Sequence, residues 1–130
     1  MTTLHAMAGH LEDAFLIRSV YLATESERQR QSNPRKVYPV DHGMIPAFDR
    51  SAQTNLGHAL ETVVLHELDR RRAEIGYVKT TEGFDVDFLA RFPDGKQELI
   101  QVCADPTQPE TLSRELRALS EGASEAAVSP

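Results

Sequence analysis

The sequence predicts an α+β protein, and three patterns lead to this fold class. Apolar residues recur at helical spacing in residues 4–11 and again in residues 54–72. Residues 15–22 and 36–40 are rich in β-branched and aromatic side chains, as strands are. Three further strand-like runs, separated by turn residues, follow between residues 77 and 104. With 130 residues, of which 40% are hydrophobic, the chain is large enough to bury a core.

The N-terminal part is predicted to be a short helix followed by a β-hairpin. Leu4, Met7 and Leu11 share one face of the helix, and the first two strand-like runs come next in the sequence. Residues 25–34 between these runs are polar and lack apolar periodicity, which predicts a mobile loop at the tip of the hairpin. A helix followed by such a hairpin indicates a winged-helix-like unit, which we assign to residues 1–50.

A basic segment lies at this predicted hairpin tip. Between residues 28 and 36 the chain carries four basic residues and no acidic one, namely Arg28, Arg30, Arg35 and Lys36. This pattern predicts contact with nucleic-acid phosphates, and the alternative interpretation is a solvated loop. The whole chain has 14 basic and 20 acidic residues, a net charge of −6, which argues against a general nucleic-acid coat and leaves room for local DNA contact.

Residues 51–122 are predicted to form a helix, a three-strand meander and a second helix. Thr54 or Asn55 caps the first helix, whose apolar stripe comprises Leu56, Leu60, Val63, Val64 and Leu68. The strands are expected at 77–80, 85–92 and 98–104, and the second helix at 109–119. Residues 123–130 are small and polar, so we expect a frayed tail.

Two carboxylates of this core stand out by their positions. Glu61 falls on the shoulder of the buried helix face, where it should look toward the sheet. Strict alternation places Asp87 on the strand face opposite to Phe88. If paired positions of the last two strands sum to an even number, Asp87 lies opposite or diagonal to Gln101 and Cys103.

In order and spacing, these segments resemble the nuclease-like domain of the PD-(D/E)xK superfamily that is found at the C terminus of many prokaryotic AAA-type ATPases, a domain of unknown function. Residues 59–68 resemble its glutamate-bearing first helix, 81–88 its "G-x-E/D-V-D-F" strand and 99–103 its "E-x-K" strand. Residues 11–17 resemble the end of its winged-helix part, and 35–43 resemble the strand that leads into the nuclease-like part. The resemblance implies a restriction-endonuclease-like α-βββ-α core after a winged-helix-like part.

The resemblance also implies a catalytic site, which this sequence matches only in part. In active members a helix glutamate, a strand aspartate and the E-x-K pair hold Mg²⁺ and activate water. Glu61 and Asp87 match the first two positions, whereas Gln101 and Cys103 stand at the positions of the acid and the lysine. A neutral amide binds a hard cation less well than a carboxylate, and a thiol supplies no ammonium. We therefore expect a degenerate site with no cofactor or with weakly bound Mg²⁺.

Three functional hypotheses follow. The favoured one is a non-catalytic accessory or interaction module of an AAA-type ATPase system that contacts DNA through the basic segment. The second is a Mg²⁺-dependent nuclease that uses Glu61, Asp87 and Gln101. The third is a winged-helix DNA-binding regulator, although residues 1–14 show no basic face. The sequence contains no G-x-x-x-x-G-K-[ST] motif, so ATP chemistry would belong to another region or protein.

The remaining expectations concern compartment and assembly. The sequence has no apolar run near the roughly 20 residues of a membrane helix, and its start lacks the pattern of a signal peptide, so a cytoplasmic protein without membrane contact is expected. Residues after Leu119 have too few β-branched residues for the further strand of the family. This leaves the strand at 98–104 with an open edge and predicts a homodimer by edge-strand pairing, or a partner that supplies the strand.

Overall fold

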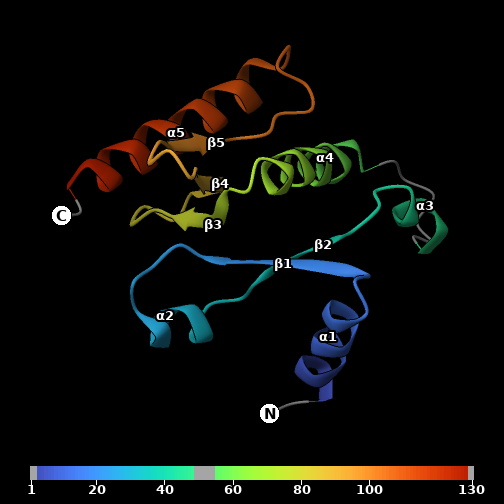
Figure 1. The fold of residues 1–130 in the computed structure, drawn as a ribbon. Helices are drawn as coiled ribbons and strands as arrows, with labels where there is room; N and C mark the ends of the chain where they lie inside the picture. The colour runs from blue at the N-terminus through green and yellow to red at the C-terminus, as the bar shows by residue number, and fades with distance from the viewer. Residues whose placement is uncertain (1–2, 49–54, 129–130) are drawn as a thin grey trace.

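The protein is a mixed α+β structure, as the sequence predicts. The computed structural model describes residues 3–48 and 55–128. In chain order the elements are α1 (Thr3–Asp13), β1 (Ile17–Leu22), α2 (Glu27–Ser32), β2 (Lys36–Pro39), α3 (Met44–Phe48), α4 (Leu56–Arg70), β3 (Glu74–Lys79), β4 (Asp85–Arg91), β5 (Gln97–Ile100) and α5 (Pro109–Val128) (Figure 1). The order α4-β3-β4-β5-α5 agrees with the predicted helix, meander and helix.

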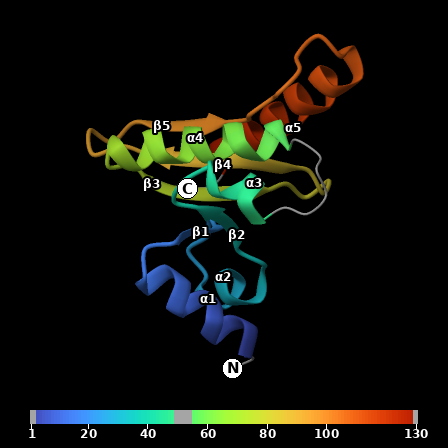
Figure 2. The ribbon, with the colours of Figure 1, turned by 90° about the vertical axis from the view of Figure 1, so that its right-hand side faces the viewer.

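One five-stranded sheet, in the order β2-β1-β3-β4-β5, spans the molecule. Neighbouring strands run antiparallel except for β1 and β3, which pair in parallel with Tyr21 opposite Gly76. The predicted β1–β2 hairpin is present, but β1 is bonded on its other side to β3, so this hairpin is part of the main sheet. Figure 2 shows α1 and α2 at the end of the molecule away from α4 and α5.

The hydrophobic core joins the N-terminal hairpin to the rest of the chain. It consists of residues from β1, β2, α4, β3 and β4, namely Val20, Tyr38, Leu65, Leu68, Tyr77, Phe88 and Ala90. Residues from both sides of the predicted boundary at residue 50 therefore meet in one core. This arrangement matters for function, because it brings β2 within reach of α4 and β4.

The buried face of α4 is rotated relative to the predicted stripe. Asn55 caps the helix as expected, since its side chain accepts a hydrogen bond from the His58 N–H. However, the buried residues are Thr62, Leu65 and Leu68, while the side chain of Val63 is 46% exposed. Thr62 tolerates burial because its hydroxyl donates to the His58 carbonyl, a bond that hydropathy patterning does not anticipate.

Two segments are more ordered than predicted. Residues 25–34, expected to be a loop, contain helix α2, whose N-terminus is capped by the Ser26 hydroxyl. The second helix was expected to end at residue 119, but α5 continues through residues 123–128 of the predicted tail; residues 129–130 lie outside the described part. Gly122 packs against Val86, and Glu125 accepts hydrogen bonds from the N–H and hydroxyl of Thr81, so contacts with β4 and the preceding turn hold this end of α5.

The last strand is shorter than predicted, but its register agrees with the prediction. β5 ends at Ile100 instead of residue 104, and Phe88 pairs with Ile100, so paired positions sum to an even number. β5 lies at one edge of the sheet and β2 at the other. Within residues 3–48 and 55–128, no helix is both long and apolar enough to cross a membrane.

Candidate functional site

A β-bulge in β4 determines where Asp87 points. Gly76 pairs with Leu89 and Val78 with Val86, so two β4 residues, Asp87 and Phe88, face the single β3 residue Tyr77. Val86 packs toward Gly122 of α5, whereas Phe88 belongs to the core beneath α4. The extra residue breaks strict alternation and brings Asp87 to the α4 side with Phe88. The predicted opposite orientation of these two residues is therefore wrong.

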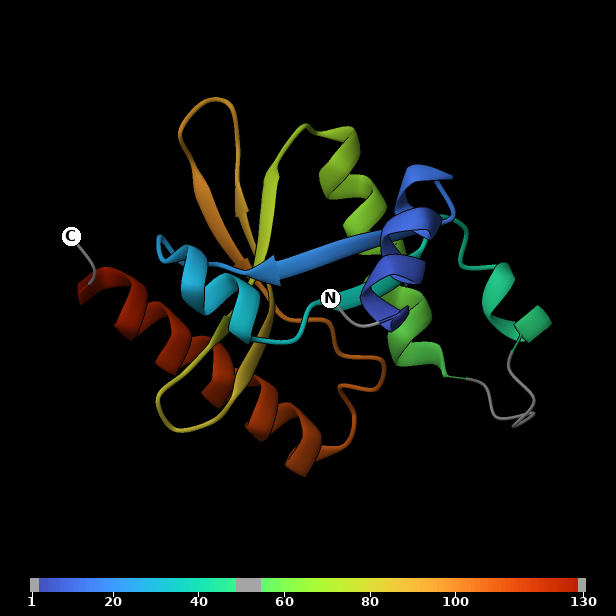
Figure 3. The same ribbon diagram turned by 90° about the horizontal axis from the view of Figure 1, so that it is seen from below.

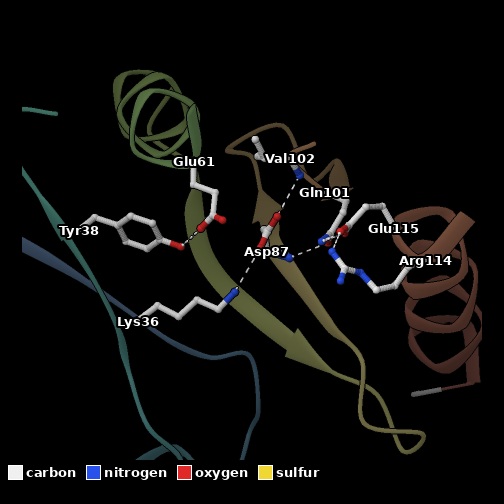
Figure 4. Close-up of polar contacts among 8 residues, drawn as sticks. All are labelled: Lys36, Tyr38, Glu61, Asp87, Gln101, Val102, Arg114 and Glu115. Carbon is white, nitrogen blue, oxygen red and sulfur yellow. Dashed lines mark hydrogen bonds and ion pairs between the residues drawn. The ribbon is translucent and has the colours of Figure 1, made fainter. Parts of the chain in front are cut away.

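Asp87 is nearly buried and is bonded on three sides (Figure 4). Its residue exposure is 7%. Its Oδ1 accepts from the Lys36 ammonium at 3.3 Å, and its Oδ2 accepts from the Val102 N–H at 2.9 Å. The Asp87 N–H donates to the side-chain oxygen of Gln101 at 3.0 Å. Beyond the Phe88–Ile100 pair, side-chain hydrogen bonds therefore replace the main-chain bonds between β4 and β5. Lys36 also lies 5.3 Å from the ring centroid of Tyr77, a cation–π contact.

Gln101 connects this site to α5. Its amide nitrogen donates to Glu115, and the other oxygen of Glu115 accepts from Arg114 at 2.7 Å. The Gln101 oxygen is already engaged by the Asp87 N–H. Both ends of the amide therefore serve to position neighbouring groups.

Glu61 reaches the same site from α4, as its predicted position on the helix suggests. Its Oε2 accepts from the hydroxyl of Tyr38 at 2.8 Å, and the Tyr38 ring stacks on His58 at a centroid distance of 5.2 Å. Burial raises the pKa of Glu61, and the Asp87 carboxylate raises it further, against the opposing effects of Tyr38 and Lys36. Burial, followed by the charge of Glu61, also raises the pKa of Tyr38.

The other residues singled out in the sequence are distributed differently. Cys103 is a free, half-buried thiol just beyond the Asp87–Val102 contact. Of the four basic residues, only Lys36 enters the site. Arg35 bonds to Glu12 at 3.6 Å and to the Tyr21 hydroxyl at 3.2 Å, while Arg28 and Arg30 are exposed on α2.

Among the described residues, the site offers few oxygen ligands for a magnesium ion. The carboxylates of Glu61 and Asp87 approach one another from α4 and β4, and the Lys36 ammonium forms an ion pair with Asp87. The oxygen of Gln101 is used by a main-chain N–H. In the described part of the chain, no group of three or more His, Cys, Asp or Glu side chains is arranged to hold a metal ion. Mg²⁺ prefers several oxygen ligands, so this donor set favours an ammonium.

Three further residues contact the site without having been predicted from the sequence: Lys36, Tyr38 and Glu115. The sequence does indicate that Lys36 and Tyr38 lie on the same face of one strand, because they are two positions apart. Their use at this site depends on the parallel pairing of β1 with β3, which no local pattern predicts. Glu115 carried no signal beyond its place on the second helix.

Comparisons of the chain with protein-family models, with curated proteins and with solved structures found no match.

The raised pKa of Glu61 predicts a specific pH dependence of stability. Because this pKa is above its ordinary value of 4.5, the folded protein binds the proton more tightly than the unfolded chain does. The free energy of unfolding therefore falls as the pH rises through the pKa of folded Glu61. We expect Glu61→Gln, which retains an acceptor for Tyr38, to be more stable than the parent at about pH 7 and to lose this advantage near about pH 4.

Urea unfolding across this pH range measures the effect. Glu67→Gln is the matched control on the same helix, since hydrogen bonds from Arg70 and Arg71 lower the pKa of Glu67 to about 2. Loss of that carboxylate should not stabilise the protein at any pH. A Glu61→Gln variant that is less stable than the parent at neutral pH contradicts the assignment of Glu61 as a destabilising charge.

The Lys36–Asp87 ion pair predicts strong energetic coupling between β2 and β4. Side-chain exposures of 25% for Lys36 and 10% for Asp87 place the pair largely out of water. Lys36→Met should therefore lower the free energy of unfolding by about 2–3 kcal/mol, because it leaves a nearly buried carboxylate without its cation. The double variant Lys36→Met/Asp87→Asn should lose less than the sum of the two single variants.

A double-mutant cycle, with each free energy taken from urea unfolding, measures this coupling. Additivity of the two single effects within about 0.5 kcal/mol would show that the two side chains act independently. A coupling energy above about 1 kcal/mol is the expected outcome.

Proposed function

We propose that the chain is a non-catalytic, degenerate nuclease-like module that serves an accessory or interaction role. One observation carries this proposal. The Lys36 ammonium lies 3.3 Å from Asp87 Oδ1, at the carboxylate that the sequence resemblance assigns to a metal ion. An internal cation thus stabilises the acidic cluster, and the site contributes to folding instead of to hydrolysis.

The neighbouring contacts support the same conclusion. Asp87 Oδ2 and the oxygen of Gln101 accept from main-chain N–H groups, so these atoms hold β4 to the segment after β5. Cys103 provides no ammonium for an attacking hydroxide. Such bonds connect β2, α4 and β4 into a rigid core, which is what an interaction module requires of its scaffold.

The nature of the partner is part of the proposal. The resemblance of the sequence suggests an AAA-type ATPase region, in the same protein or in a separate one. DNA contact through the basic segment would fall mainly to Arg28 and Arg30, because Arg35 and Lys36 are engaged with Glu12 and Asp87.

A Mg²⁺-dependent nuclease is the second candidate function. Two observations favour it: the Glu61 and Asp87 carboxylates do converge, and Lys36 brings to the site the ammonium that residue 103 lacks. In this case Lys36 would have to leave Asp87 for a metal to bind there.

A cleavage assay distinguishes the two candidates. Supercoiled plasmid and linear DNA are incubated with the full chain in millimolar Mg²⁺ or Mn²⁺, beside Asp87→Asn and Lys36→Met. We expect no cleavage by the parent above the level of Asp87→Asn. Cleavage by the parent that Asp87→Asn and Lys36→Met both abolish would establish the nuclease instead, provided that circular dichroism shows both variants folded.

The edge of β5 is the surface we propose for pairing with a second chain. Among the strands of the described residues, β5 pairs only with β4, which leaves its outer edge for an added strand. Sedimentation velocity over a range of concentrations should therefore reveal a dimer in the micromolar range typical of weak assemblies, about 1–100 μM. A protein that sediments as a monomer up to about 1 mM would remove this proposal.

A further inference from the structure

A polar pocket lies away from the Glu61–Asp87 site and shares no residue with it. It has a volume of about 220 Å³ and is formed by the end of β1, the segment after it, α2, β3 and β4. Figure 3 shows α2 beside the end of β1. Two arginines from different elements line this pocket, Arg30 from α2 and Arg91 from the end of β4.

Both arginines of the pocket keep N–H groups that could donate further hydrogen bonds. Arg91 Nε is buried and has no hydrogen-bond partner within the described residues, and Arg91 Nη1 lies 4.0 Å from Glu25. Arg30 Nη1 lies 4.0 Å from Glu27, and its Nη2 reaches the Thr24 carbonyl at 3.4 Å.

Other arginines of the protein are bonded more closely. Arg18 reaches Asp69 at 3.2 Å, Arg70 reaches Glu67 at 2.7 Å, and Arg117 reaches Glu121 at 2.8 Å. The contacts of Arg30 and Arg91 with carboxylates are longer than these three, so both guanidinium groups keep donors for a ligand. Guanidinium groups with unused donors in a concave site are suited to an anion, above all to phosphate.

The size and charge of the pocket restrict the anion to a single small group. Pockets that bind drug-sized ligands measure about 300–1,000 Å³, so this smaller pocket takes a phosphate with only part of an organic substituent. Two carboxylates, Glu25 and Glu74, also line it, and the formal charge of the lining is therefore balanced. The side chain of Glu25 is 97% exposed, so this carboxylate is free to turn away from Arg91 into solvent.

We propose that the Arg30–Arg91 pocket binds one phosphate group, either as inorganic phosphate or at the end of a small phosphate monoester. Charge-assisted hydrogen bonds from the two guanidinium groups hold the phosphate oxygens. The half-buried side chains of Leu22 and Leu89 provide an apolar wall for the organic part of a monoester. This inference stands on the pocket alone and does not depend on the function proposed above.

Amide chemical-shift titration of the full chain tests the proposal. Inorganic phosphate, adenosine 5′-monophosphate and adenosine are added separately, with sodium chloride keeping the ionic strength constant so that general screening cancels. We expect saturable shifts with both phosphates, centred on Thr24, Ile75 and Gly76, and none that saturate with adenosine. Tighter binding of the monophosphate identifies a monoester as the ligand, and equal affinities identify free phosphate.

Three variants test the role of the arginines. Arg30→Gln and Arg91→Gln should each weaken phosphate binding by about tenfold or more, because each removes a charged donor. Arg28→Gln is the matched control, since Arg28 is exposed on the same short helix and does not line the pocket. Its affinity for phosphate should equal that of the parent.

Two results would overturn the proposal. One is a phosphate titration of the parent that remains linear and shows no shifts near the pocket. The other is an equal loss of affinity in the Arg28→Gln and Arg30→Gln variants, which would indicate a diffuse charge effect. Arg30 lies on an exposed helix, so its variant carries the test even if Arg91→Gln does not fold.

Discussion

The ion pair between Lys36 and Asp87 connects the N-terminal hairpin to β4 of the C-terminal part of the sheet. Lys36 lies on β2, at one edge of the sheet, and Asp87 lies on β4, two strands beyond β1. The pair spans 51 residues of sequence and crosses the ring of Tyr77 on β3. A nearly buried carboxylate needs a compensating charge, so the burial of Asp87 depends on the position of β2 and its Lys36. The acidic site forms only because the N-terminal hairpin belongs to the main sheet.

The same ion pair bears on the pKa of the neighbouring carboxylate, Glu61. Lys36 neutralises Asp87, but Glu61 remains as a second carboxylate beside it, with Tyr38 as its hydrogen-bond donor. Burial raises the pKa of Glu61, and the neighbouring carboxylate of Asp87 raises it further, because one ammonium does not compensate two carboxylates. A ligand that brings positive charge would relieve this imbalance. Within the chain, the Lys36 ammonium donates a hydrogen bond to Asp87 and the Tyr38 hydroxyl donates one to Glu61.

Local patterns predicted the elements well and the long-range arrangement less well. The helical period around Leu65 and the turn at Gly95 are local signals, and they predicted α4 and the β4–β5 hairpin with its register. The parallel pairing of β1 with β3 joins residues such as Tyr21 and Gly76, which lie far apart in the sequence, and no periodicity encodes it. The sequence does not predict the bulge at Asp87 either, because Val-Asp-Phe-Leu is compatible with strict alternation.

Only the residues of the candidate site that local patterns indicate could be predicted from the sequence. Glu61 follows from helix geometry and Gln101 from the hairpin register, whereas strand alternation gave the wrong orientation for Asp87, which the resemblance singled out. Lys36 was assigned to a basic surface segment, since its charge was visible and its partner across the sheet was not. A long side chain on a strand acquires its role from the strands that it crosses, which only the folded structure reveals.

The central claim is that the Lys36 ammonium occupies the cation position of the acidic site. A crystal structure of the protein soaked in Mn²⁺, with anomalous diffraction data, tests it most directly. The account predicts Lys36 Nζ within hydrogen-bonding distance of Asp87 and no anomalous peak between Asp87 and Glu61. A manganese ion bound by both carboxylates, with Lys36 displaced, would contradict it.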